Sequence, residues 1–182
     1  MAYFSIRPSL ISSLVLVSIL LATPSSASKF VDVNVLCAQT RDPSFCSIIL
    51  NSKPGGVKGA DLVSLAQYTN RVARARGMDA TKLLNTLVSK TGSDPKAKAH
   101  YINCWRNFNS YQGAFKYIDN IEVALNKEDY YGVFHDATVV LRDIYDCISG
   151  DYLDRSHLPQ SVDIFERVVD IILTISKYLI QK

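Results

Sequence analysis

Four cysteines are the side chains of this sequence whose spacing says most about its chemistry. Cys37, Cys46, Cys104 and Cys147 include no C-x-x-C pair, and no histidine lies near any of them, so their spacing favours disulfides over a zinc site. An even number of cysteines in a secreted chain indicates two disulfides. The sequence alone allows three pairings of the four residues.

The other reactive side chains form no catalytic constellation. The sequence has no G-x-S-x-G, no H-E-x-x-H and no glycine-rich phosphate loop. His100, His135 and His157 are interpreted as surface or boundary residues. His135 and Asp136 are neighbours on a predicted helix, where successive side chains point about 100° apart, so no dyad is expected. We therefore expect no enzyme activity, no metal site and no cofactor.

The charges argue against a nucleic-acid partner. Twenty lysines and arginines stand against 17 acidic residues, a formal charge of +3, and the arginines of residues 71–76 are interpreted as a solvated helix face. Asp143, Asp146 and Asp151 are interpreted in the same way, as a solvated helix end.

The first 27 residues predict a secretory signal peptide. Arg7 gives a positive start, residues 10–21 form an apolar run too short to span a bilayer, and Ser25 and Ala27 supply the small residues of a cleavage site. We expect residues 28–182 to form one soluble, secreted domain.

Helical periodicity organises that domain around residues 94–127. Asp94 supplies an N-cap and Pro95 suits the first helical position, so these residues predict one long amphipathic helix. Its apolar stripe comprises Ala97, Tyr101, Cys104, Phe108, Tyr111, Phe115, Ile118, Ile121 and Leu125, with Glu122 in one expected apolar position. A helix of about 30 residues needs neighbours of similar length.

Three further long helices are predicted. One begins at Asp61 and contains Gly77, where a kink or a weakened turn is expected. Another follows a corner at residues 127–129. The last follows a polar loop at residues 151–160 and is apolar around most of its girth, which is typical of a core helix, but charge interrupts it too often for a membrane span. Its polar line consists of Asp163, Arg167, Asp170, Thr174, Lys177 and Gln181.

Four long helices joined mostly by short loops predict an all-α, up-down-up-down four-helix bundle over residues 61–182. Residues 29–50 predict a short helical hairpin in front of it, whose arms are too short to be stable alone. Its apolar residues Phe45, Ile48 and Ile49 are expected to bury against the bundle or a second copy.

Antiparallel packing selects one disulfide pairing. Cys104 lies near the start of its predicted helix and Cys147 near the end of the next, and those two ends are adjacent in an antiparallel pair. We therefore predict Cys104–Cys147, which leaves Cys37–Cys46. The chain-entropy contributions are about 4 and 2.7 kcal/mol.

The cysteine arrangement resembles that of a known family. The spacing Cys37-x8-Cys46 with TRDP at residues 40–43, and the segment ALNKEDYYG at residues 124–132 leading to Cys147, are similar to the plant inhibitors of pectin methylesterases and invertases. The resemblance covers residues 29–182. It implies the same bundle, hairpin and disulfides, no catalysis, and bundle helices that cover the active-site cleft of a carbohydrate enzyme. The expected location is the apoplast or cell wall, with the vacuole as the alternative.

The resemblance places the expected partner-binding residues at the start of the third bundle helix. They are Asn126, Asp129, Tyr130, Tyr131 and Gly132. The family's invertase inhibitors often carry Pro-Lys-Phe where this chain has tyrosine, tyrosine and glycine, so we expect pectin methylesterase as the target and invertase as the alternative. Asp146 stands where the esterase inhibitors typically have threonine.

Two other functions and the oligomeric state stay open at this point. The chain could be a small-molecule carrier with a cavity among its tyrosines, or a storage or pollen-type protein without inhibitory activity. A large apolar pocket would favour the carrier, and a tightly filled bundle would favour the inhibitor. We expect a monomer or a weak dimer through the N-terminal hairpin.

Overall fold

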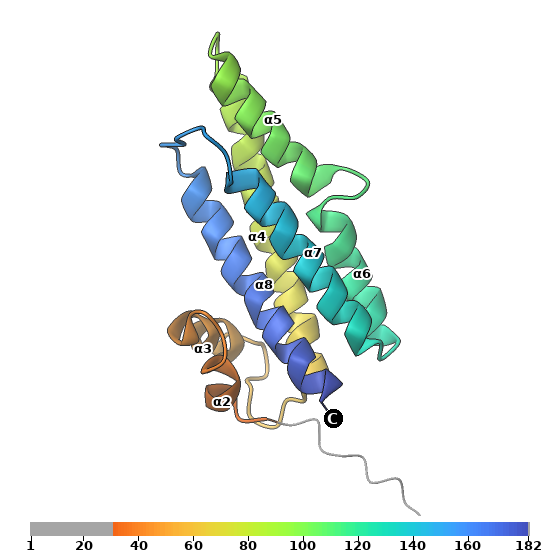
Figure 1. Cartoon of the computed structure of the whole chain (residues 1–182). Coiled ribbons are helices and arrows are strands. Elements are labelled where there is room, and N and C mark those ends of the chain that lie inside the picture. The colour runs from red at the N-terminus through yellow and green to blue at the C-terminus, as the bar shows by residue number, and fades with distance from the viewer. Residues whose placement is uncertain (1–30, 182) are drawn as a thin grey trace, which may run out of the picture.

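Within residues 31–181, which the structure describes, the computed structural model is built from helices alone. The elements are α2 (Val33–Cys37), α3 (Pro43–Asn51), α4 (Leu62–Lys90), α5 (Pro95–Asn109), α6 (Ala114–Asn126), α7 (Tyr130–Ile148) and α8 (Leu158–Ile180). Figure 1 shows α4, the α5–α6 pair, α7 and α8 side by side with alternating direction, and the α2–α3 hairpin beside α8. The predicted all-α bundle is confirmed. The predicted signal peptide lies outside the described residues.

The helix predicted over residues 94–127 is in fact two helices. α5 ends at Asn109, its C-cap Ser110 has an extended backbone, and α6 begins after Gly113. A Cβ at Gly113 would lie 2.6 Å from the backbone oxygen of Asn107, so this close approach requires glycine. The chain therefore turns at residues 110–113 and resumes as α6 in a new phase.

The new phase corrects the apolar stripe expected from the sequence. Ala114 is buried, whereas Tyr111 is 87% exposed and Phe115 is only half-buried. Ile121 lies in the core one position before Glu122. Glu122 itself is half-buried.

α4 continues through Gly77 as one helix of 29 residues. A Cβ at this position would come within 3.1 Å of the Phe115 ring and 3.2 Å of the Phe165 ring. The sequence predicted a kink or a weakened turn here, and the structure gives the glycine a packing role instead. Close approach of these two rings offsets the helix-propensity cost of glycine, about 1 kcal/mol.

α8 is buried along most of its length and packs against α4 and α7. Its Phe165 meets Phe108 of α5 edge to face, with ring centroids 5.7 Å apart, the arrangement that aromatic quadrupoles favour. α8 is thus a core helix, as its apolar girth predicts.

Two disulfides tie the fold together, in the predicted pairing. Cys104 of α5 is bonded to Cys147 of α7, and Cys37 is bonded to Cys46 across the α2–α3 hairpin. All four cysteines are buried, and the described residues include no free cysteine.

The hairpin is held on α8 by charge. The Arg41 guanidinium lies 2.6 Å from Glu166 and 3.2 Å from Asp163, and its backbone N–H donates to Asp170 at 2.9 Å. Arg167 in turn pairs with Asp42 at 3.0 Å. Part of the polar line of α8 is therefore the surface on which the hairpin sits.

The apolar residues of the hairpin divide between core and solvent. Ile49 is buried as expected, and Phe45 is half-buried under the Arg167 guanidinium, 5.5 Å from the ring centroid. Ile48, however, is 64% exposed, so it does not bury against the bundle, and of the two expected alternatives only a second copy could cover it.

Candidate functional site

The expected partner-binding residues lie on a tight corner between α6 and α7, at the lower right of Figure 1. The backbone N–H of Asp129 donates to Ala124 at 2.9 Å, and that of Glu128 donates to Leu125 at 3.2 Å. These two bonds are the Schellman pattern that satisfies carbonyls at a helix end. Glu128 takes the left-handed conformation that the pattern requires, with φ 57°. α6 therefore ends sharply.

α7 begins at once, because Asp129 caps it. The Asp129 carboxylate accepts a hydrogen bond from the backbone N–H of Gly132 at 2.9 Å. A Cβ at Gly132 would lie 2.5 Å from the Asp129 carboxylate. Glycine at position 132 thus leaves room for the Asp129 carboxylate in its present place.

The two tyrosines of the corner differ in how far they are exposed to solvent. Tyr131 is 72% exposed, whereas Tyr130 is half-buried and packs on the core. The neighbouring Asn126 accepts a hydrogen bond from Gln67 of α4 at 3.2 Å, which ties the end of α6 to the bundle. We call this corner, residues 126–132, the tip. The structure brings its five expected residues together, and Tyr131 is the ring that a partner could reach.

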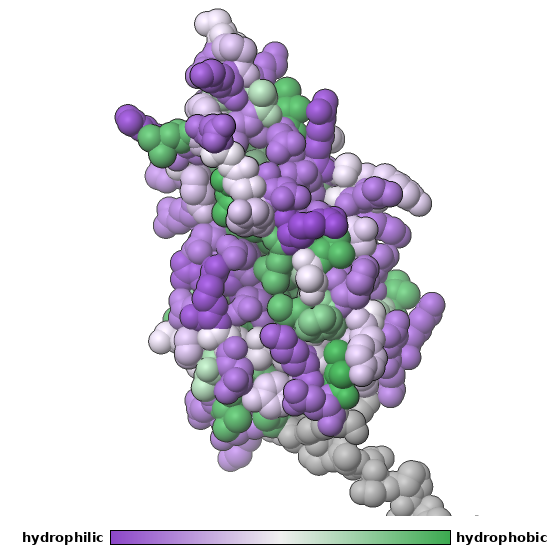
Figure 2. All heavy atoms as spheres, in the orientation of Figure 1, coloured by the Kyte–Doolittle hydropathy of each residue, from purple (hydrophilic) through white to green (hydrophobic). Residues whose placement is uncertain are grey.

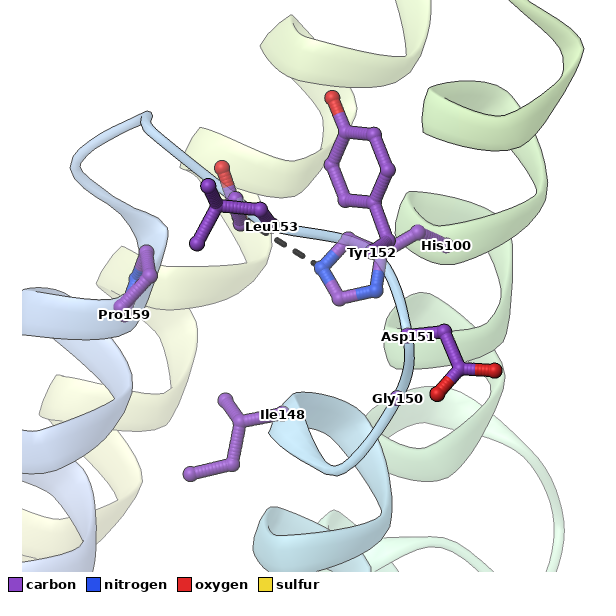
Figure 3. A pocket seen from close by; sticks show the side chains of 8 residues that line it. His100, Ile148, Gly150, Asp151, Tyr152, Leu153 and Pro159 are labelled. Atoms are coloured by element: carbon purple, nitrogen blue, oxygen red, sulfur yellow. Dashed lines mark ion pairs between the residues drawn. The ribbon is translucent and has the colours of Figure 1, made fainter.

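A second cluster lies at the opposite end of the bundle, under the α7–α8 loop (Figure 3). The Asp154 carboxylate accepts hydrogen bonds from the Tyr101 hydroxyl at 3.1 Å and from the Ser156 backbone N–H at 2.8 Å. Its other oxygen faces His100 Nε2 at 3.5 Å. Tyr152 packs beside His100, with ring centroids 4.9 Å apart. These contacts fasten the loop to α5.

This second cluster was missed by the sequence reasoning, which interpreted His100 as a surface or boundary residue. His100 and Asp154 lie far apart in the chain, and no local motif joins them. Burial and the nearby Asp154 carboxylate raise the pKa of Tyr101 to about 12, so its hydroxyl remains a hydrogen-bond donor. Two overlapping surface hollows, about 350 and 510 Å³, open beside the loop.

Asp143 corrects another expectation. It was interpreted as part of a solvated helix end, but its side chain is buried and pairs with Arg142 at 3.0 Å. Burial raises its pKa above the usual value, and the Arg142 guanidinium opposes that rise.

His135 and Asp136 were expected not to form a catalytic dyad because they are neighbours on a helix, but His135 Nδ1 lies 3.0 Å from the Asp136 carboxylate. The His135 side chain is exposed, whereas that of Asp136 is largely buried. The described part of the chain contains no cluster of ligating side chains that could hold a metal ion. Nor is any helix between residues 31 and 181 long and apolar enough to cross a membrane.

Known proteins similar to this chain are pectinesterase inhibitors, although no protein-family model matches it. It is 25% identical over 160 residues to "Pectinesterase inhibitor 2" of Arabidopsis thaliana, covering 86% of this chain and 89% of that protein. It is 33% identical over 113 residues to "Pectinesterase inhibitor" of Actinidia deliciosa, covering 59% of this chain and 60% of that protein. The resemblance seen in the sequence is confirmed. Because these relatives are inhibitor proteins, the prediction that the chain is not an enzyme is confirmed as well.

Two solved structures share the fold. Mutant form A of a pectin methylesterase inhibitor from Arabidopsis superposes with a TM-score of 0.67 at 24% identity, covering 80% of this chain and 95% of that one. A pectin methylesterase inhibitor from Arabidopsis thaliana superposes with a TM-score of 0.57, also at 24% identity, covering 80% and 93%.

Proposed function

We propose that the chain is a secreted, non-catalytic inhibitor of a plant pectin methylesterase, which it blocks by covering the active-site cleft of the enzyme. The observation that supports this most is the match to two pectinesterase inhibitors, one of which is covered over 89% of its length. The proposed location is the apoplast or cell wall, with the vacuole as the alternative.

A rigid tip supports steric occlusion. Binding costs less when the contacting side chains are already held in place, and the tip is held by a Schellman ending on one side and the Asp129 cap on the other. Tyr131 stands on the first turn of α7, so its backbone is fixed before any partner arrives. Exposed tyrosines on a rigid support are typical interface anchors.

The tip alone is too small for a stable complex, because specific interfaces bury about 800 Å² on each partner. The adjoining surface of α6 and α7 would have to contribute. Val123, on the last turns of α6, is half-exposed and adds apolar area beside the tip. Figure 2 shows several separate apolar patches among hydrophilic residues on the face that α7 and α6 share.

The sequence of the tip favours the esterase over invertase as the target. A Pro-Lys-Phe tip would present a rigid wedge with a lysine and an aromatic anchor. Gly132 stands at the position of that anchor, where a Cβ would lie 2.5 Å from the Asp129 carboxylate. The tip of this chain is therefore a single tyrosine suited to a broader groove.

The carrier alternative finds less support. The side chains between the helices, such as Phe108, Ile144 and Phe165, are fully buried and in mutual contact. The hollows we describe lie at the surface, and the two largest open beside the α7–α8 loop. A filled bundle leaves an interior ligand no room.

The exposed face of the hairpin supports a weak dimer as the alternative to a monomer. Val35 of α2 and Ile48 of α3 are both exposed, although each belongs to an element too short to fold alone. Two such residues form a small patch, so any dimer through them would be weak.

The experiment that tests the function is a titration of the purified protein against a plant pectin methylesterase and against an acid invertase. We expect inhibition of the esterase that saturates at one inhibitor per enzyme. Inhibition of neither enzyme would favour the storage or pollen-type alternative, and inhibition of invertase alone would reject the proposed target.

A further inference from the structure

Although the total formal charge is nearly balanced, basic and acidic residues are concentrated in different segments of the chain. Residues 62–109, which form α4 and α5, contain eight lysines and arginines and two acidic residues, a formal +6. Residues 128–170, which form α7, the following loop and the first half of α8, contain ten acidic and three basic residues, a formal −7.

The fold turns this separation into two different sides of the molecule. α4 and α5 pack on each other along a seam, where Asn109 of α5 donates to Thr81 of α4 at 3.5 Å. α4 also packs on α8, and α5 on α7, whereas α4 does not contact α7, so α4 with α5 and α7 with α8 form opposite sides of the bundle. The basic side chains therefore gather over α4 and α5, and hydrophilic residues cover α5 in the upper part of Figure 2.

Several bases of the α4–α5 side have no acidic partner within the described residues. Arg74 pairs with Asp119, and Lys82 lies 3.9 Å from Asp79. By contrast, no ion pair forms within residues 31–181 for five exposed bases of this side. These are Arg71, Lys90, Lys96, Lys98 and Arg106. An exposed cation without an ion-pair partner can attract an anion from solution, whereas a buried or paired cation attracts it far less.

An exposed indole lies among these bases. Trp105 is 39% exposed and, with Asn85, Val88 and Ile102, lines a shallow hollow of about 170 Å³ in the α4–α5 seam. Lys98, Ile102 and Trp105 are four and three residues apart on α5, so they share one face of that helix. Lys98 and Arg106 are about 12 Å apart along the helix axis, at 1.5 Å per residue.

We propose that this surface, defined by Lys90, Lys98, Trp105 and Arg106, binds an anionic polysaccharide built of uronate sugars with free carboxylates. Lysine and arginine recognise carboxylates by charge-assisted hydrogen bonds. A flat aromatic ring suits the apolar face of a sugar ring, and a row of cations suits a row of carboxylates. The hollow is too shallow to enclose a compact ligand but fits one ring of a chain that runs along the seam.

The choice of uronate rests on the proposed function. A pectin methylesterase removes methyl esters from pectin and leaves carboxylates on the chain, so anionic uronate accumulates where the enzyme acts. Binding to it would concentrate the inhibitor at those sites. The tip lies at the opposite end of α6 from the α5–α6 turn, so one molecule could hold the polysaccharide and present Tyr131 at the same time.

The test is the affinity of the mature chain, residues 28–182, for immobilised polygalacturonate, with no enzyme present. The probe variant is Lys98→Glu with Arg106→Glu. The control is Lys58→Glu with Lys177→Glu, which changes the net charge equally at exposed positions away from the seam. We expect at least about tenfold weaker binding for the probe variant, from about 1 kcal/mol per base near an anionic surface, and little change for the control.

Three comparisons complete the test. Binding to polygalacturonate should weaken as salt rises to about 0.15 M, and fully methyl-esterified pectin should bind at least about tenfold more weakly. Trp105→Ala should weaken binding while leaving its salt dependence unchanged. Equal losses of affinity in the probe and control variants would overturn the assignment of this surface as the binding site. Tighter binding of a single-stranded oligonucleotide than of polygalacturonate would overturn the choice of uronate as the ligand. Failure of the proposed inhibition would appear only in the enzyme titration and would leave these affinities unchanged.

Discussion

The Asp129 carboxylate accepts a hydrogen bond from the backbone N–H of Gly132 at 2.9 Å, and no side chain larger than hydrogen fits at position 132 without displacing that carboxylate. The start of α7 is therefore fixed by the residue that precedes it. Because this contact aligns the first turn, the direction of Tyr131 depends on two residues that need never touch a partner themselves.

The left-handed backbone conformation of Glu128 can be tested by stability measurements that need no binding partner. A non-glycine residue in this conformation costs about 1 kcal/mol relative to glycine. We expect Glu128→Gly to have a free energy of unfolding about 1 kcal/mol higher than Glu128→Ala, since both variants lose the same carboxylate. Urea unfolding measures the difference. If the alanine variant proved the more stable, the left-handed conformation would be wrong.

The two disulfides should differ in their contribution to stability. Cys104–Cys147 closes a loop with a sequence separation of 43, and Cys37–Cys46 one of 9. We expect the double alanine variant of the first pair to lose about 4 kcal/mol in free energy of unfolding and that of the second pair about 2.7 kcal/mol. Equal losses, or the reverse order, would contradict the chain-entropy account.

Gly77 should tolerate no larger side chain. Overpacking a filled site costs about 1–3 kcal/mol, and a side chain at Gly77 would press on Phe115 and Phe165. We expect Gly77→Val to lower the free energy of unfolding by that amount. Ala75→Val, on the exposed face of the same helix, should cost only the smaller difference in helix propensity. Helix propensity alone favours valine over glycine, so a loss for Gly77→Val no larger than that for Ala75→Val would contradict the packing role of Gly77.

The raised pKa of Asp143 predicts the direction in which the free energy of unfolding changes with pH. Burial raises its pKa in the folded state above the usual 3.8, so the folded protein holds this proton more tightly than the unfolded chain. The parent therefore loses stability as pH rises from the usual value through the raised one. Asp143→Asn should remove that loss, so its stability relative to the parent should increase across the window. Asp151→Asn, at an exposed site, should show no such change, and a falling difference for Asp143→Asn would contradict the assignment.

The sequence predicted the bundle, the hairpin and the disulfide pairing because these depend on periodicity and on antiparallel geometry. Cys104 and Cys147 meet because helices of similar length must pack side by side. The break before α6 was missed because the apolar period passes through residues 110–113 with almost no gap. Gly113 was the available signal.

The tip was located by resemblance, but its geometry could not be read from the residues alone. Nothing local says that Tyr130 turns toward the core and Tyr131 away from it, since both positions are compatible with a helix start. His100 and Asp154, and the basic surface on α4 and α5, depend on which helices become neighbours. Whole-chain charge concealed that surface, because the acidic residues lie on the other side of the bundle.

Titration of a plant pectin methylesterase with the parent protein, Tyr131→Ala and Tyr145→Ala tests the central claim most directly. Tyr145 is 65% exposed on the same helix but near its other end, so it controls for loss of an exposed tyrosine. Tyr130→Ala is unsuitable because its half-buried ring also supports the core. We expect unchanged thermal stability in both variants. Loss of an anchor costs about 2 kcal/mol, so Tyr131→Ala should inhibit about 30-fold more weakly, and Tyr145→Ala like the parent. Inhibition by Tyr131→Ala equal to that of the parent would contradict the account of the tip.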